Sequence, residues 1–127
     1  MGATRTVALT ELPFRGISVN TTETAITVVA SDSGVIFVNE NASACTYTLP
    51  TVALAKGKWF WFFNVGAAGM VITGGTTDVM VGLNDAAADT VTFGTTSEKI
   101  GAACAIFCDG TNYFVLPFNA ATPTYSG

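Results

Sequence analysis

The feature that most restricts how this chain can fold is a row of five aromatic residues, Trp59 to Phe63, in the segment KGKWFWFFNVG. Aromatic residues favour β-strands, and alternate side chains of a strand point to opposite faces. Trp59, Trp61 and Phe63 then share one face, and Phe60 and Phe62 the other. A strand with one solvent-exposed face alternates apolar and polar residues. A strand that is apolar on both faces must therefore lie between two layers of protein. Either another segment of the chain or another subunit covers the second face.

The same region raises the alternative of a membrane-spanning helix, because Trp59 to Thr77 contains no charged residue. Its apolar residues are concentrated in the first third, and Asn64 and several glycines interrupt the rest. A turn at Asn64-Val65-Gly66 followed by the β-prone run MVITG favours two strands instead. The chain also lacks the clustered Lys and Arg that bind anionic membranes, so no membrane partner is expected.

Short β-prone runs separated by turn signals make up the rest of the sequence, and no stretch has a helical period. The expected strands are TRTVALTEL, ETAITVVA, VIFVN, CTYTLP, GMVITGG, DVMVG, TVTFG, IGAACAIFC and YFVLPF. We expect VIFVN and CTYTLP to form a hairpin or meander, LNDAAAD to be a loop, and Asp109-Gly110 to turn the last hairpin. No internal repeat is recognised. The predicted fold is all-β: an antiparallel β-sandwich or jelly-roll-like single domain, ahead of a closed barrel.

A length of 127 residues is typical of one domain. We expect residues 1–127 to form a single β domain, with residues 1–16 as an N-terminal strand or docking arm and residues 119–127 as a C-terminal tail. Half of the residues are hydrophobic and only 11% are charged, so another chain is expected to cover part of the apolar surface. The candidates for the core or a subunit interface are Trp59, Phe60, Trp61, Phe62 and Phe63.

The charge and the cysteines limit the partners and the compartment. The net charge is −4, and the five basic residues are scattered along the chain, so no nucleic acid partner is expected. The first residues, MGATRTVALTELPFRG, lack the pattern of a secretory signal, which predicts folding in a cytoplasm. The three cysteines are expected to be buried free thiols, and a disulfide bond from Cys45 to Cys104 or Cys108 is the alternative.

The sequence contains no catalytic pattern. It has no histidine, which removes the usual general base and the usual metal ligand. Asp78, Asp85 and Asp89 lie close in sequence and could act as paired carboxylates of a glycosidase, but they are typical turn and loop residues. We therefore predict no enzyme, no catalytic residue, no metal site and no cofactor.

The order of several segments resembles a module of bacteriophage virion proteins, found in head decoration (cement) proteins and in β-rich domains of tail fibres. The resemblance covers about Ala25 to Leu116 and depends on the segments SDSGVIFVN, TYTLP, GKWFWFFNVG, MVITGG and CDGTNYFV. Each of these segments is also typical of β-hairpins in general, so the motifs are moderately specific. The resemblance implies a non-enzymatic β-structured protein, commonly trimeric, that assembles in the host cytoplasm and is carried on the virion.

The first functional hypothesis is a capsid decoration protein, a homotrimer that binds the major capsid protein on the outer capsid surface and stabilises the shell. In it, the segment from Gly2 to Arg15 is a docking arm that adds a strand to an exposed sheet edge, or else an ordinary edge strand. The candidate arm residues are Thr4, Arg5, Val7, Leu9, Phe14 and Arg15.

Two alternatives belong to other functional classes. A tail fibre or receptor-binding module would bind a host surface glycan through exposed aromatic residues such as Tyr47, Tyr113 and Tyr125. A small glycosidase would place two carboxylates across a cleft, roughly 5 to 10 Å apart.

Overall fold

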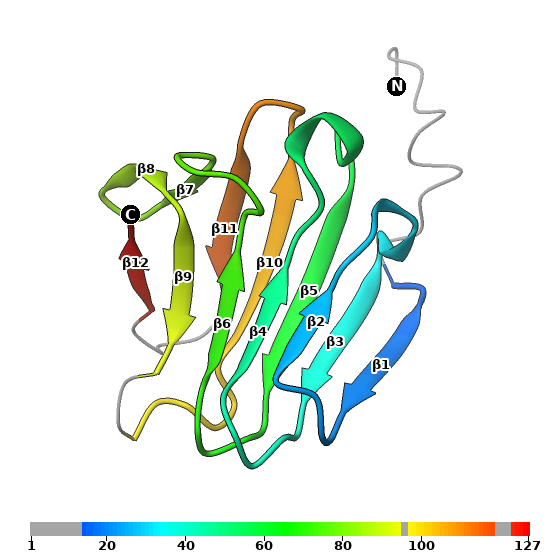
Figure 1. Cartoon of the computed structure of the whole chain (residues 1–127), viewed down its shortest axis with the longest axis vertical. Coiled ribbons are helices and arrows are strands. Elements are labelled where there is room, and N and C mark those ends of the chain that lie inside the picture. Colours follow the sequence, from blue (N-terminus) through cyan, green and yellow to red (C-terminus); the bar gives the residue numbers. More distant parts are fainter. Residues whose placement is uncertain (1–13, 95–96, 119–122) are drawn as a thin grey trace.

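The computed structural model describes residues 14–94, 97–118 and 123–127, which form two β-sheets and two short 3-10 helices, η1 (Ala30–Asp32) and η2 (Val52–Leu54) (Figure 1). Sheet A contains, in spatial order, β1 (Gly16–Asn20), β3 (Val35–Asn39), β5 (Trp59–Asn64), β10 (Ala103–Cys108), β11 (Tyr113–Pro117), β7 (Met80–Gly82) and β8 (Asp85–Ala88). Sheet B contains β12 (Thr124–Ser126), β9 (Thr90–Phe93), β6 (Met70–Thr73), β4 (Cys45–Thr48) and β2 (Ala25–Thr27). The all-β prediction is confirmed.

The first six strands alternate between the two sheets, so that each pair of strands makes one turn of a coil. Within sheet A, β1 pairs in parallel with β3 and β3 with β5. Within sheet B, β2 pairs in parallel with β4 and β4 with β6. These six strands are three coils of a parallel β-solenoid, and β9 and β10 then continue the two sheets in antiparallel pairing (Figure 1).

This arrangement corrects the antiparallel part of the prediction, because both sheets are mixed. Two sheets that enclose one core are compatible with the predicted β-sandwich. The predicted hairpin of VIFVN with CTYTLP is wrong, since these strands are β3 and β4 and lie in different sheets. The physical reason is the corner after β3, where Asn39 forms hydrogen bonds with the neighbouring coils and the chain crosses to sheet B. Parallel neighbours need a crossover of this kind, whereas a hairpin needs only a tight turn.

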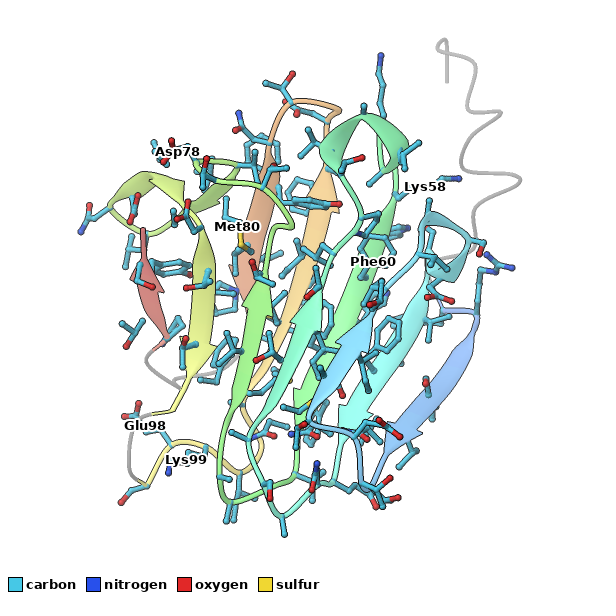
Figure 2. All side chains as sticks on the ribbon, in the orientation of Figure 1. Lys58, Phe60, Asp78, Met80, Glu98 and Lys99 are labelled. Carbon is cyan, nitrogen blue, oxygen red and sulfur yellow. The ribbon has the colours of Figure 1, made fainter. Side chains whose placement is uncertain are left out.

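The two sheets enclose one hydrophobic core. Phe60 and Phe62 are 0% and 1% exposed and belong to this core, and Figure 2 labels Phe60 on β5. From sheet B, the ring of Tyr47 packs against both Phe37 and Phe62, with centroid distances of 5.7 Å and 5.3 Å, and these two rings stack on each other at 5.4 Å. The expected alternation of the aromatic segment is therefore confirmed for its inner side.

Other sequence expectations have mixed outcomes. The last hairpin is confirmed: Oδ1 of Asp109 accepts hydrogen bonds from the N–H groups of Thr111 and Asn112, each at 2.8 Å. The expected loop LNDAAAD contains strand β8, and the expected tail of residues 119–127 contains β12, which pairs with β9. Gly16–Asn20 forms β1, a strand that was not among those expected from the sequence. The run TRTVALTEL lies outside the described residues.

The region considered as a membrane span forms β5 and β6. Among residues 14–94, 97–118 and 123–127, no helix is long and apolar enough to cross a membrane. All three cysteines are free and buried, as expected.

Candidate interaction surface

The outer face of sheet A is apolar across neighbouring strands. Because paired residues of a sheet share a face, the strand register assigns its side chains to rows. One row, from β1 to β11, is Ile17, Ile36, Trp61, Ala105 and Leu116. The next is Val19, Val38, Phe63 and Ala103, and it ends at Phe118, whose N–H donates to the carbonyl of Ala103. A third is Trp59, Phe107, Phe114 and Val81. We call these three rows the apolar face.

The apolar face contains no polar or charged side chain, and much of it is open. Ile17 is 66% exposed, Leu116 52% and Phe107 42%. The two alanines of β10 are small, and larger side chains around them leave both buried. Soluble monomers rarely expose a continuous apolar area of this kind, and such areas usually mark binding surfaces.

Aromatic stacking fixes the side chains of the apolar face in place. The ring of Trp61 lies 4.7 Å from that of Phe14 and 5.3 Å from that of Phe118, and both pairs are stacked. Trp59 lies 5.2 Å from Trp61. Residues from before β1 and after β11 therefore converge on one tryptophan of the apolar face.

The outer face of sheet B differs in chemistry. Its two rows in register are Thr27, Thr48, Thr73, Thr90 and Ser126, and Ala25, Thr46, Val71, Thr92 and Thr124. Hydroxyl groups dominate both rows, and Thr90 Oγ1 lies 2.7 Å from Ser126 Oγ. A threonine-rich face is compatible with solvent exposure. Of the two outer faces, only the apolar face of sheet A is therefore expected to be buried against another protein surface.

The structure divides the aromatic candidates Trp59 to Phe63 into two groups. Phe60 and Phe62 belong to the core, whereas Trp59, Trp61 and Phe63 belong to the apolar face. Most of the remaining face residues were not singled out from the sequence. The available signal was the recurrence of runs that are apolar at consecutive positions, such as VIFVN and YFVLPF, beside the aromatic segment.

Of the candidate arm residues, Thr4, Arg5, Val7 and Leu9 lie outside the described residues. Phe14 stacks on Trp61. Arg15 directly precedes β1, and its N–H donates to the carbonyl of Gly34 at 2.8 Å. Its Nη1 also donates to the carbonyl oxygens of Ser31 and Ser33, at 3.1 Å and 3.2 Å.

The acidic residues considered for glycosidase chemistry act as acceptors in turns. Oδ1 of Asp89 accepts a hydrogen bond from the N–H of Asp78 at 2.6 Å, and Oδ1 of Asp85 accepts one from Ala87 at 3.0 Å. Figure 2 shows Asp78 at one end of the molecule, near β7. Within the described part of the chain, no three His, Cys, Asp or Glu residues are grouped to hold a metal ion.

The tyrosines considered for glycan binding are not available on the surface. Tyr47 and Tyr113 are fully buried, and Tyr125 is partly buried against the core. Burial raises the pKa of all three phenols. The hydroxyl of Tyr113 donates to the carbonyl of Pro50. These residues therefore support the fold and do not form a sugar-stacking platform.

The three thiols are also internal. Burial is the main cause that raises the pKa of Cys45, Cys104 and Cys108, so each thiol is held in its protonated form. A thiolate is the nucleophile and metal ligand, so these cysteines are inert in the folded state.

In comparisons with known proteins, the chain matches no protein-family model, no curated protein and no solved structure.

Proposed function

We propose that the protein is a non-enzymatic structural protein of a bacteriophage virion, a capsid decoration protein that binds the outer capsid surface as a homotrimer and stabilises the shell. The observation that supports association is the apolar face of sheet A. The virion context comes from the resemblance of the segments between Ala25 and Leu116 to modules of phage particles.

The size of the apolar face suits a stable subunit interface. Six of its side chains are between 41% and 66% exposed, and large aromatic side chains bury roughly 150–250 Å² each. Together with the half-buried tryptophans they offer on the order of 700 Å², close to the roughly 800 Å² that one partner contributes to a standard interface. Three copies that turn this face towards one another would leave the threonine-rich face of sheet B in water.

The alternative, a tail fibre or receptor-binding module, would use the same apolar face for assembly. Its proposed glycan contacts through Tyr47, Tyr113 and Tyr125 lose support, because these side chains are buried or partly buried. The decoration protein is therefore the function we favour.

The test is the molar mass of the purified protein by light scattering, followed by co-sedimentation with undecorated capsids. The wild type should have three times the chain mass of 13.1 kDa, or a multiple of that trimer, and should pellet with shells. The double variant Phe107→Ser, Leu116→Ser should lose the trimer and the pelleting while it keeps its β-sheet circular dichroism.

The matched control is Thr48→Ser, Thr92→Ser, which changes two residues of the opposite outer face. It should leave mass and pelleting unchanged. A wild-type monomer, or a trimer unaffected by the Phe107 and Leu116 substitutions, would contradict an interface on the apolar face. A trimer that does not bind capsids would contradict the decoration role and leave the assembly intact.

A further inference from the structure

Strand β1 leaves one hydrogen-bonding edge of sheet A open. It pairs with β3 on one side, and among the described residues no strand lies on its other side (Figure 1). Natural sheets usually protect such an edge with Pro, Lys, a bulge or a very short strand. Gly16–Asn20 has the sequence GISVN and includes none of these devices. The edge can therefore accept a further strand.

The ladder between β1 and β3 identifies the groups at this edge. The carbonyl of Asn20 accepts a hydrogen bond from the N–H of Glu40 at 2.8 Å, so the backbone groups of Asn20 face β3. In a parallel ladder, alternate residues direct their N–H and C=O groups to opposite sides of the strand. The groups of Ile17 and Val19 consequently point away from β3 and lie at the open edge.

This edge is complementary to itself in one register. An antiparallel copy of β1 centred on Ser18 places Ile17 opposite Val19 of the second copy, and Val19 opposite its Ile17. These are the residues whose backbone groups point outwards, so both pairs exchange two N–H···O=C bonds, and the two Ser18 residues form the non-hydrogen-bonded pair between them. Ile17 and Val19 also lie on the apolar face, 66% and 52% exposed, and would cover each other across the strands.

The charges at the two ends of β1 favour the same antiparallel direction. Arg15 precedes the strand and is exposed. At the other end lie the exposed residues Glu23 and Glu40. The N–H of Glu23 donates to Oδ1 of Asn20, and the N–H of Glu40 donates to the carbonyl oxygen of Asn20, each at 2.8 Å. Antiparallel pairing brings Arg15 of one copy towards Glu23 of the other, whereas parallel pairing sets the two arginines together. Asp32, between the two serines whose carbonyl oxygens bind Arg15, adds one negative charge at the Arg15 end. A two-fold interface repeats this match at both ends.

We propose that β1 is a self-pairing edge, at which a second copy of this chain adds its own β1 in antiparallel register centred on Ser18 and joins two copies of sheet A into one continuous sheet. This contact uses the strand edge and involves only Ile17 and Val19 of the apolar face, so it goes beyond the proposed function and does not depend on it. Combined with threefold association through the apolar face, it would double the trimer.

The test is Val19→Pro, analysed by light scattering over a range of concentrations. Because the N–H of Val19 points to the open edge, proline removes a donor needed by the second copy and no bond within the chain, as is typical of proline in edge strands. The matched control Val19→Thr keeps the N–H and the β-branched shape, and it measures how much a side-chain change at this position of the apolar face lowers the mass by itself. The mass of Val19→Pro should fall to half that of the wild type and below that of Val19→Thr, with an unchanged midpoint of urea unfolding for the isolated subunit.

An independent measurement covers the case in which Val19→Pro does not fold. Facing residues of a non-hydrogen-bonded pair have Cα atoms about 4.5 Å apart, within the range that a disulfide spans. Ser18→Cys should therefore give a covalent dimer on a non-reducing gel after treatment with oxidised glutathione. The control Thr48→Cys, on the outer face of sheet B, should give none.

Absence of the Ser18→Cys dimer, or a wild-type mass that Val19→Pro does not change, would overturn the proposal. A third outcome would also overturn it: if Val19→Pro keeps the mass but no longer pellets with capsids, the strand added at this edge belongs to a capsid protein. Loss of the trimer in the Phe107→Ser, Leu116→Ser variant tests the apolar face alone, so the two interfaces can fail separately.

Discussion

Asn39 donates a hydrogen bond from Nδ2 to Oδ1 of Asn64 at 2.9 Å, between two buried side chains of neighbouring coils. Oδ1 of Asn39 in turn accepts from Nδ2 of Asn20 at 3.0 Å. The three asparagines end β1, β3 and β5, where the chain turns from sheet A towards sheet B. They form a ladder that fixes the corner of each coil, and each amide in it has both donor and acceptor partners.

Removing the middle asparagine should destabilise the fold. Asn39→Ala leaves Nδ2 of Asn20 and Oδ1 of Asn64 without this partner in a buried site, and each orphaned group costs about 1–3 kcal/mol. We expect a loss of about 2–5 kcal/mol in the free energy of unfolding, measured by urea denaturation. Thr48→Ala, which removes a half-buried hydroxyl on the outer face of sheet B, is the control and should lose far less. Equal losses in both variants would show that the ladder adds no stability.

The sequence was sufficient for the fold class and for most strands, because aromatic and β-branched runs bounded by turn residues give a strong local signal. It did not reveal the solenoid. Parallel coils are not joined by hairpin turns, so no turn dipeptide in the sequence indicates them. The asparagines that mark the repeat are unequally spaced, by 19 residues from Asn20 to Asn39 and by 25 from Asn39 to Asn64. The strand pattern alone could not show which sheet each strand joins.

The interaction surface was predictable in part. Alternation in the aromatic segment was enough to separate Trp61 from Phe60, since a strand has two faces. The sequence could not show that Ile17, Phe107 and Leu116 lie in register with Trp59 and Trp61, because that depends on strand order. It also could not show that Tyr47 is buried, since a tyrosine in a strand suits either a core or a surface.

The two faces of β5 and β10 should respond differently to the same change. Phe60→Ser removes a fully buried ring from the core, where loss of a large aromatic typically costs about 3–5 kcal/mol, so the chain should unfold or become insoluble. Phe107→Ser changes a ring that is 42% exposed on the apolar face and should weaken association more than subunit stability. Urea denaturation and light scattering on both proteins make the comparison. A Phe107→Ser protein as unstable as Phe60→Ser would place Phe107 functionally in the core.

Alkaline pH should destabilise the protein. Burial raises the pKa of Cys104, Tyr47 and Tyr113 in the folded state above their ordinary values of 9.0 and 10.0. Below about pH 9 these groups are protonated in both states, and their contribution to the free energy of unfolding is fully present. As the pH rises above about 9, the unfolded chain loses these protons before the folded chain does, so the free energy of unfolding falls. Urea midpoints at pH 7, 9 and 10 measure the effect.

The thiol contribution can be isolated with Cys104→Ala. This variant should be less stable at neutral pH because it leaves a small cavity, but its stability should fall less steeply between pH 8 and 10 than that of the wild type. An identical slope in both proteins would assign the alkaline loss to the tyrosines or to other groups.

The corner after β5 should tolerate no side chain at Gly66. Its N–H donates to the carbonyl of Asn39 at 2.9 Å, and a Cβ added at Gly66 would lie 2.2 Å from the backbone oxygen of Asn41. Backbone cannot move aside as a flexible side chain can, so Gly66→Ala must displace the corner and should cost about 1–3 kcal/mol or more. Gly94→Ala is the matched control, since its nearest neighbour is the Thr92 methyl carbon at 3.3 Å, and it should stay within about 1 kcal/mol of the wild type. If urea denaturation gave Gly66→Ala the stability of Gly94→Ala, the close approach of the corners after β3 and β5 would not limit the packing of the solenoid.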